Sequence, residues 1–382
     1  MGNSFFERKE LLSLLLLVFT FSGFTNSGAK YIVWGMFFVL YVVSTTPIKK
    51  LFDRNASLVL IFSMSYAVFG FLNHVIDNIP YLLFIGLSPS FFYVYGKYIS
   101  WKTNNVNKLS LFFLLITIAF SSFIYWMVLT GRYFHFGSIA EERVLLDQNG
   151  EVMMAATGVG TTVSMSLIGL FVAMSIRNLR LIQRIVWVVC FVLSLYVVTF
   201  FVNRTGVNIV MIMGVVFLLF NSRKSVGRTW LSISLMAIIL ALILYVGVIS
   251  GDIFNQYQMR GDEDVRSERW VEAMGLILSH PLGFSNVTHY NVHNMWLDIA
   301  RLTGWIPFLI ITLLTMRSIK SMLRLLKNNN SEIVTLLLYM FICMTLSCAV
   351  EPLLTGVPLY FLAYLILLGM INQYACIFQR LE

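Results

Sequence analysis

Charged residues are scarce in this sequence. They make up 12% of the 382 residues, whereas soluble domains carry about 25%. Apolar residues make up 58%, and the mean hydropathy is +0.81. This composition excludes a soluble globular domain and indicates a polytopic membrane protein. No repeat period of about 20–50 residues and no low-complexity tract interrupts it, so we expect one integral membrane domain over residues 1–382.

Cysteine is also rare, and its positions count against two kinds of site. The four cysteines all lie within apolar runs or at their ends: Cys190, Cys343, Cys348 and Cys376. Such positions indicate neither a disulfide framework nor a cysteine-based metal site.

The apolar residues gather in runs that can cross a bilayer, which takes about 20 helical residues and at least about 17. The first run follows Arg8 and Lys9 and ends near Ser27, as a signal peptide would, but we expect an uncleaved first helix. The sequence therefore predicts an all-α fold with about twelve transmembrane helices. These helices are expected at 11–27, 31–46, 57–73, 79–95, 109–129, 157–176, 185–202, 207–221, 230–250, 303–316, 333–349 and 356–374.

Lysine and arginine are sparse in every second connection between these runs. With the N-terminus inside, 19 of the 27 basic residues fall in cytoplasmic connections. The outside connections hold thirteen acidic residues and eight basic ones: Lys30, Arg132, Arg143, Arg204, Arg260, Arg266, Arg269 and Arg301. This distribution follows the positive-inside rule and predicts that both termini are cytoplasmic. The basic pI therefore reflects membrane topology and requires no nucleic-acid partner.

Two outside connections are long, residues 130–156 and 251–302, and we expect short helices in both. The second holds four arginines and three of the five histidines, so it is the candidate catalytic loop. Its residues 262–279 are predicted to form a helix that lies along the membrane surface or against the bundle. Pro281 and Gly283 break that helix. A new helix is expected to begin near 291–293, where Asn291 could cap exposed amides.

Arg204 is the strongest candidate for binding an anion. It lies in a very short outside turn, 202–206, and Asn203 or Thr205 can cap the helix that follows. The amino end of that helix adds partial positive charge, and arginine grips phosphate with two donors. The alternative is an arginine that reaches lipid headgroups from a helix end.

His293 and Glu351 are the candidates for proton chemistry. A histidine in the first turn of a helix feels the positive end of the helix dipole, which keeps a lone pair available. Glu351 follows an apolar run and precedes Pro352, and a carboxylate at that depth could orient a histidine or an arginine or bind a sugar hydroxyl. The alternatives are a structural histidine and an ordinary turn residue.

Other charged residues outside have plain structural alternatives. Arg266 and Arg269 are three residues apart and can face one ligand, or can pair with neighbouring glutamates. Arg301 can likewise pair with Asp298. The acidic run 262–264 could bind a divalent metal, but a solvated helix start explains it better, so no metal site is expected.

These landmarks, in their order along the chain, resemble the bacterial O-antigen polymerase and ligase superfamily, the Wzy-type polymerases in particular. The resemblance covers roughly residues 143–316 and is carried by a series of short motifs. They are Arg143 before Gly150, Asn203-Arg204-Thr205-Gly206, an arginine-rich helix ending in Trp270, Pro281-Leu282-Gly283-Phe284, His293-Asn294 and Gly304-Trp305. Ser285 follows Phe284 where the family pattern has a second glycine.

The resemblance implies a glycosyltransferase of the bacterial inner membrane that works at the periplasmic face without cofactor or metal. It would transfer an undecaprenyl-pyrophosphate-linked glycan onto another lipid-linked repeat unit, alongside membrane lipids and a chain-length regulator protein. Arg204 would hold the donor pyrophosphate, with Arg266 or Arg269 assisting, and His293 would deprotonate the acceptor hydroxyl. Arg143, Asn294 and Arg301 would also contact substrate. The remaining alternatives are an O-antigen ligase, which moves the glycan to lipid A core, and a polysaccharide flippase, which would show internal repeats and charges at mid-membrane.

Overall fold

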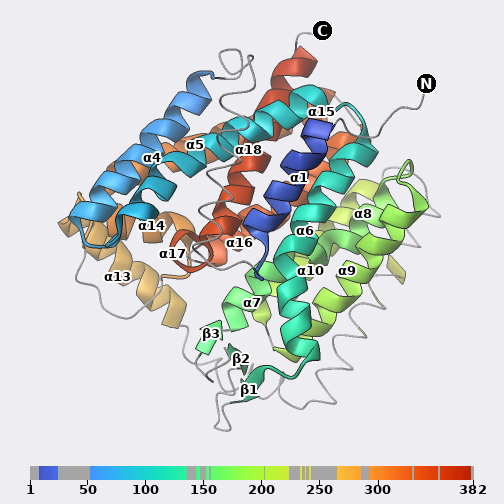
Figure 1. Cartoon of the computed structure of the whole chain (residues 1–382), viewed down its shortest axis with the longest axis horizontal. Coiled ribbons are helices and arrows are strands. Elements are labelled where there is room, and N and C mark those ends of the chain that lie inside the picture. The colour runs from blue at the N-terminus through green and yellow to red at the C-terminus, as the bar shows by residue number, and fades with distance from the viewer. Residues whose placement is uncertain are drawn as a thin grey trace.

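The structure is a computed structural model that describes residues 8–24, 52–135, 143–146, 152–154, 156–201, 203–222, 265–284, 292–328, 331–351 and 353–379, with a few single positions between 233 and 241. Within them the chain is a helical bundle with one small sheet (Figure 1). The first helices are α1 (Arg8–Phe21), α4 (Arg54–Leu72), α5 (Ile79–Lys102), α6 (Val106–Leu129), α7 (Ala156–Val163) and α8 (Gly169–Ser175), with the 3-10 helix η1 (Ser164–Ile168) between the last two. The others are α9 (Leu181–Phe200), α10 (Arg204–Ser222), α13 (Val265–Ser279), α14 (Met295–Thr303), α15 (Trp305–Asn328), α16 (Glu332–Val350), α17 (Leu353–Gly356) and α18 (Pro358–Gln379).

The described helices support a multi-pass membrane protein. Eight stretches of the described chain are long and apolar enough to cross a membrane, and Leu11–Phe21 and Thr205–Phe220 are shorter apolar helices. Ten of the twelve predicted spans coincide with these ten stretches. Span 31–46 lies outside the described residues, and so does nearly all of 230–250.

Two helices run further than the charge pattern predicts. The span expected at 303–316 is part of α15, which continues to Asn328 through four basic residues. Lys97, assigned to a cytoplasmic connection, lies inside α5 and is buried, with 2% of its surface exposed. Lysine and arginine are good helix formers with long apolar stems, so charge ends the apolar run without ending the helix.

The spans alternate in direction between two ends of the bundle. At the basic end, where α4, α6, α9 and α16 begin, Asn107 bonds to the backbone oxygen of Asn178. At the opposite end, here the site end, those four helices finish. There Asn73, which follows α4, donates to the backbone oxygen of Leu302. Figure 1 shows the C-terminus at the top and the three strands at the bottom edge.

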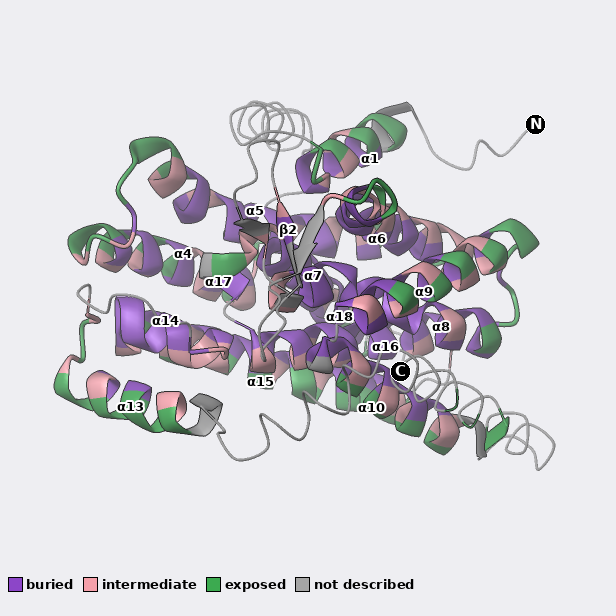
Figure 2. Ribbon diagram, turned by 90° about the horizontal axis from the view of Figure 1, so that it is seen from below, coloured by how far each residue is buried: buried purple, intermediate pink, exposed green. Residues whose placement is uncertain are grey.

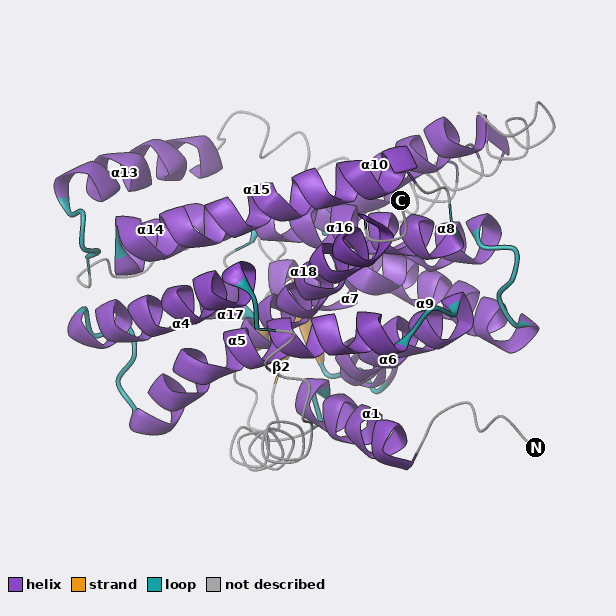
Figure 3. Ribbon diagram, turned by 90° about the horizontal axis from the view of Figure 1, so that it is seen from above, coloured by secondary structure: helices purple, strands orange, loops and turns teal. Residues whose placement is uncertain are grey.

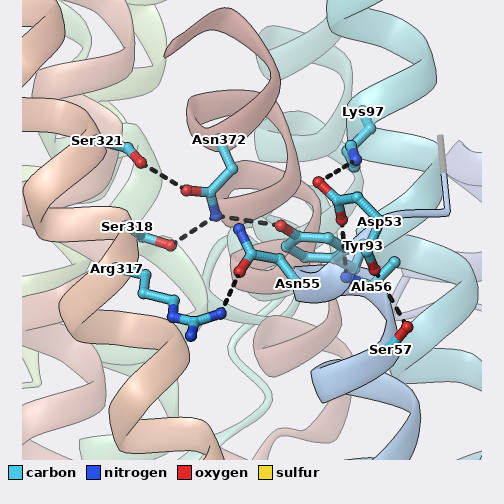
Figure 4. Close-up of polar contacts among 10 residues, drawn as sticks. All are labelled: Asp53, Asn55, Ala56, Ser57, Tyr93, Lys97, Arg317, Ser318, Ser321 and Asn372. Atoms are coloured by element: carbon cyan, nitrogen blue, oxygen red, sulfur yellow. Dashed lines mark hydrogen bonds and ion pairs between the residues drawn. The ribbon is translucent and has the colours of Figure 1, made fainter. Parts of the chain in front are cut away.

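Polar side chains tie three helices together at the basic end (Figure 4). The Asn372 amide of α18 donates to Tyr93 Oη of α5 at 3.1 Å and to Ser318 Oγ of α15 at 2.9 Å. Its oxygen accepts from Ser321 at 2.8 Å. Because apolar contact alone favours lipid as much as protein inside a bilayer, such hydrogen bonds help to specify which helices associate.

Two ionic groups continue this network toward the start of α4 (Figure 4). Lys97 Nζ lies 2.8 Å from Asp53 Oδ2, and the Asp53 side chain is 38% exposed. Arg317 donates to Asn55 Oδ1 at 2.9 Å. The buried lysine is thereby paired at the edge of the bundle, where its partner still reaches solvent.

Close backbone approach joins α5 to α18. A Cβ added at Gly96 would lie 2.0 Å from the Ile366 carbonyl oxygen, and one at Gly369 would lie 2.1 Å from the Tyr93 carbonyl oxygen. Glycine is therefore required at both positions, since any side chain would force the two helices apart. This crossing forms the centre of the buried core.

The first long connection contains strands where we expected short helices. Strands β1 (Tyr133–His135), β2 (Arg143–Leu146) and β3 (Val152–Met154) form an antiparallel sheet in the order β1-β2-β3. Hairpin pairing satisfies the backbone groups of these residues locally, and it lets Leu145 of β2 be buried. The all-α prediction is therefore wrong for this connection.

Candidate functional site

The site end brings together three segments that are distant in sequence. Glu351 follows α16, His293 precedes α14, and Thr205 lies in the first turn of α10. The Glu351 side chain is 5% exposed and that of His293 is 17% exposed. A carboxylate at this depth is costly unless other groups contact it, so its partners define the site.

Glu351 contacts one of these segments with each oxygen. Its Oε2 lies 3.5 Å from His293 Nδ1, and its Oε1 accepts a hydrogen bond from Thr205 Oγ1 at 3.3 Å. Both contacts are longer than a typical hydrogen bond. Such distances are common in catalytic groups before substrate closes the site. With Nδ1 directed to the carboxylate, Nε2 is the ring nitrogen left for another partner.

His293 has an unusual backbone conformation. Its φ of 51° lies in the left-handed region, and only one other described non-glycine residue, His74, has a positive φ. For a residue with a large side chain this costs about 1 kcal/mol or more, so neighbouring contacts must impose it.

The two neighbours of His293 supply those contacts. The Val292 carbonyl accepts from Trp270 Nε1 at 2.7 Å. Asn294 Oδ1 accepts from the Leu297 amide at 3.0 Å, and Asn294 Nδ2 donates to the Ala349 carbonyl at 3.1 Å. The last bond ties the start of α14 to the end of α16, two residues before Glu351.

These contacts correct two expectations for the second long connection. The cap of α14 is Asn294, and Asn291 lies outside the described residues. His293 therefore precedes the helix and is not in its first turn, so the helix dipole acts on it more weakly than predicted. Asn294, expected to contact substrate, directs both ends of its amide to backbone groups and so positions its neighbour.

The start of α10 is packed tightly beside this pair. Asn203 Oδ1 accepts from the Gly206 amide at 2.6 Å, which confirms one of the two capping options for this turn. Asn203 is buried, and a Cβ added at Gly160 of α7 would lie 2.3 Å from its amide group. Arg204 is the first residue of α10, next to Thr205, and its side chain lies outside the described part of the structure.

The other predicted arginines are spread over several elements. Arg143 opens β2, and Arg266 and Arg269 belong to α13; the side chains of Arg143 and Arg266 lie outside the described part. Arg269 is half-buried. Arg301 is 5% exposed and donates to Asp298 Oδ1 at 2.8 Å. The guanidinium is therefore buried in an ion pair within α14, the structural alternative considered for it, and its contact with substrate stays a prediction.

The second long connection has three further candidates, the acidic run 262–264, His280 and His289. The predicted metal alternative at 262–264 and His289 lie outside the described residues. Among the residues that are described, no group of three or more histidines, cysteines or carboxylates could hold a metal ion. His280 packs against Phe284 with ring centroids 4.3 Å apart and the ring planes tilted by 41°, and its Nδ1 lies 2.9 Å from Ser279 Oγ.

Sequence reasoning missed two contributors to the site. Thr205 was considered only as a helix cap, but it bonds to Glu351. Trp270 was noted as an apolar residue that ends the arginine-rich helix motif, without a contact of its own, but its indole donates to the carbonyl of the residue before His293. A tryptophan N–H usually finds an acceptor when buried, which is the signal that could have identified the second contact.

An apolar cavity of about 290 Å³ lies beside the end of α17. Tyr81 lines it and also donates to the Leu354 carbonyl of α17 at 3.5 Å. Other lining residues are mainly aromatic or aliphatic: Phe21, Phe84, Phe120, Phe123, Ile124, Met154, Val357, Pro358 and Leu359. The short helix α17 therefore has the carboxylate at its start and an apolar hollow beside its end.

Comparison with known proteins adds no assignment. The sequence matches no protein-family model and no curated protein.

Proposed function

We propose that this protein is an O-antigen polymerase of the Wzy type, which joins lipid-linked glycans at the outer face of the bacterial inner membrane. The observation that carries the proposal is the contact of Glu351 with His293 on one oxygen and Thr205 on the other. It assembles a base candidate, a buried carboxylate and the helix start that carries Arg204. His293 and the turn that holds Arg204 and Thr205 belong to the motifs in which the sequence resembles that family, whereas Glu351 lies outside the resemblance.

The orientation follows from the charge of the two ends. The basic end holds the lysine and arginine clusters between the spans, so by the positive-inside rule it faces the cytoplasm. The site end then faces the periplasm, where undecaprenyl-pyrophosphate-linked repeat units are the expected donor and acceptor. A chain-length regulator protein is the expected partner in the membrane.

The proposed reaction needs a base and an anion site. The acceptor sugar hydroxyl gives its proton to His293 Nε2 while its oxygen bonds to the anomeric carbon of the donor sugar. The bond from that carbon to the pyrophosphate oxygen breaks, and the pyrophosphate leaves with the electron pair. Glu351 orients the imidazole and stabilises the imidazolium, as a carboxylate does for a catalytic histidine elsewhere. Arg204, with Arg266 or Arg269, stabilises the negative charge that develops on the leaving pyrophosphate.

Two other functions compete with this proposal. A ligase uses the same donor chemistry, so it would need the same residues and differ in the acceptor. A flippase would need charged groups along a path through the membrane. The buried pair of Lys97 and Asp53 lies at the basic end, where Asp53 reaches solvent, and so gives little support to such a path.

The test is the surface polysaccharide profile of cells that lack the gene and carry wild-type protein, His293→Ala, Glu351→Gln, Arg204→Ala or His280→Ala at matched expression. His280 is the control, because it belongs to the same connection but contacts Ser279 and Phe284. We expect the long ladder with wild type and His280→Ala, and a single repeat unit on the lipid core with the other three.

Each alternative gives a different gel. Loss of all core-attached polysaccharide, with lipid-linked polymer accumulating, would identify a ligase. A full ladder with all three site variants would exclude the proposed site and favour transport.

A further inference from the structure

Helix α13 lies on the outside of the bundle at the site end. Figures 2 and 3 show it alongside α14, with its outer side covered by no described element. In Figure 1 it runs across the direction of α4 and not along it. Its residues fall into three stripes, because successive residues are about 100° apart around a helix axis.

One stripe faces the protein and one faces water. Ala273 and Ile277, which are 0% and 4% exposed, pack toward α14 together with Trp270. The exposed polar residues Glu268 and Glu272 form a second line, about 140° away around the helix. A surface helix of a soluble protein needs only these two stripes.

The third stripe is apolar and exposed. Val271, Met274 and Leu278 are 72%, 53% and 74% exposed, and they lie within about 60° of one another around the helix. The stripe lies between the protein-facing and the water-facing lines. This is the arrangement of a helix that lies in the plane of a membrane surface with protein on its inner side.

Backbone contacts set the depth of α13. The Pro281 carbonyl, just after the helix, accepts from the amide of Trp305, the first residue of α15. The next carbonyl, that of Leu282, accepts from Asn73 at the end of α4 at 2.9 Å. Helices α4 and α15 are both candidate spans, so their ends at this level mark the membrane boundary. A tryptophan at the first position of a span is typical of that boundary.

The surface of α15 that would face lipid is also apolar and exposed. Ile306, Leu309 and Leu313 are 47%, 55% and 41% exposed along the first turns of that helix. We propose that Val271, Met274 and Leu278 of α13 are immersed in the headgroup and upper acyl region of the outer leaflet, so that α13 anchors the candidate catalytic loop to the lipid surface. This proposal does not depend on the reaction catalysed.

The test uses fluorescent labels on single cysteines. Cys376 is the exposed cysteine among the four and is replaced by serine. In this background Leu278→Cys reports the apolar stripe and Glu272→Cys the polar stripe, and Leu309→Cys is the lipid-facing reference. Each variant is labelled with an environment-sensitive dye and reconstituted in vesicles of equal parts phosphatidylethanolamine and phosphatidylglycerol, with iodide on both sides. Val271→Cys gives a second reading of the apolar stripe if Leu278→Cys does not fold.

The expected result is several-fold stronger quenching of the Leu278 label by a nitroxide near the headgroup end of the acyl chain than by iodide. The Glu272 label should show the reverse order, and the Leu309 label should be quenched by nitroxide lipid in any successful reconstitution. Equal quenching of the Leu278 and Glu272 labels by iodide would overturn the proposal in favour of a solvated helix. Protection of the Leu278 label from both quenchers would overturn it in favour of a protein partner or a second copy of the chain.

Discussion

At the basic end Asn372 makes three side-chain hydrogen bonds of 2.8, 2.9 and 3.1 Å, whereas at the site end Glu351 is held by contacts of 3.3 and 3.5 Å. The short contacts join helices α5, α15 and α18 and leave the amide satisfied. The long contacts surround a buried carboxylate, and one of them comes from a histidine in a strained conformation. Backbone strain and long contacts around a buried charge are typical of sites that rearrange on binding. Fully satisfied networks of short hydrogen bonds are typical of contacts that make the structure rigid.

The largest expected effect is the loss of activity when His293, at the site end, is replaced. Replacing His293 by alanine removes the proposed base, and general base catalysis contributes about 10²–10⁴-fold. We expect glycan polymerisation in membranes to fall by about that factor while the amount of folded protein is unchanged. The measurement is incorporation of lipid-linked repeat units into polymer by washed membranes.

Glu351→Gln should lower the same activity, because a neutral amide cannot stabilise the imidazolium. Asn372→Ser at the basic end is the matched control and should leave activity per folded molecule near the wild-type value. Equal losses per folded molecule at the two ends would contradict the functional distinction between them.

The next effect is on stability, at the crossing of α5 and α18. Gly96→Ala places a Cβ 2.0 Å from the Ile366 carbonyl oxygen. Overpacking of this kind costs about 1–3 kcal/mol, and backbone contact puts this case at the upper end. Unfolding in detergent can be followed with a thiol-reactive dye, since Cys190, Cys343 and Cys348 are buried.

Gly275 provides the control, because a Cβ there would meet nothing within 4 Å. In the interior of α13, Gly275→Ala should be neutral or stabilising by up to about 1 kcal/mol. If Gly96→Ala unfolded at the same temperature as wild type, the close crossing would be wrong.

A smaller effect distinguishes the two members of the ion pair at the basic end. Asp53→Asn leaves Lys97 buried without its carboxylate, whereas Lys97→Met removes the buried charge and keeps the volume. We expect Asp53→Asn to be the more destabilising, by less than the ~3–5 kcal/mol typical of fully buried pairs, because Asp53 is 38% exposed. The same thiol-reactivity assay ranks the two variants, and the opposite order would show that the lysine needs no partner.

The smallest effect tests how His293 is positioned. Asn294→Ser keeps an oxygen that can cap α14 but loses the bond to the Ala349 carbonyl. Ser and Asn are about equal as caps, so we expect less than about 1 kcal/mol of lost stability. Polymerisation should fall more than stability does, since the base is less well held; a parallel loss of both would mean that Asn294 acts only as a cap.

Parts of this organisation could be predicted from the sequence because they depend on local pattern. Apolar runs located ten of the predicted spans, which match eight candidate spans and two shorter apolar helices among the described residues. The capping role of Asn203 followed from its place before an apolar run. The depth of Glu351 followed from its position at the end of one.

Other parts depend on which segments meet in space, and a single sequence does not encode this locally. Nothing in residues 90–100 indicates that Lys97 would be buried beside Asp53. The choice of Arg301 between a ligand and Asp298 depends on how α14 packs. The strands at 133–154 form by pairing with one another, and short irregular stretches lack the alternation that would reveal it.

The meeting of residues 205, 293 and 351 also has a consequence for how the protein is made. A ribosome delivers these segments in order, so the contacts of Glu351 with Thr205 and His293 cannot form until α16 has been made. Helix α5 is buried later still, because its close crossing at Gly96 and Gly369 requires α18, the last described helix. The contacts of Glu351 and the crossing of α5 with α18 therefore form late in the order of synthesis of the described helices, and truncation after residue 350 should abolish both.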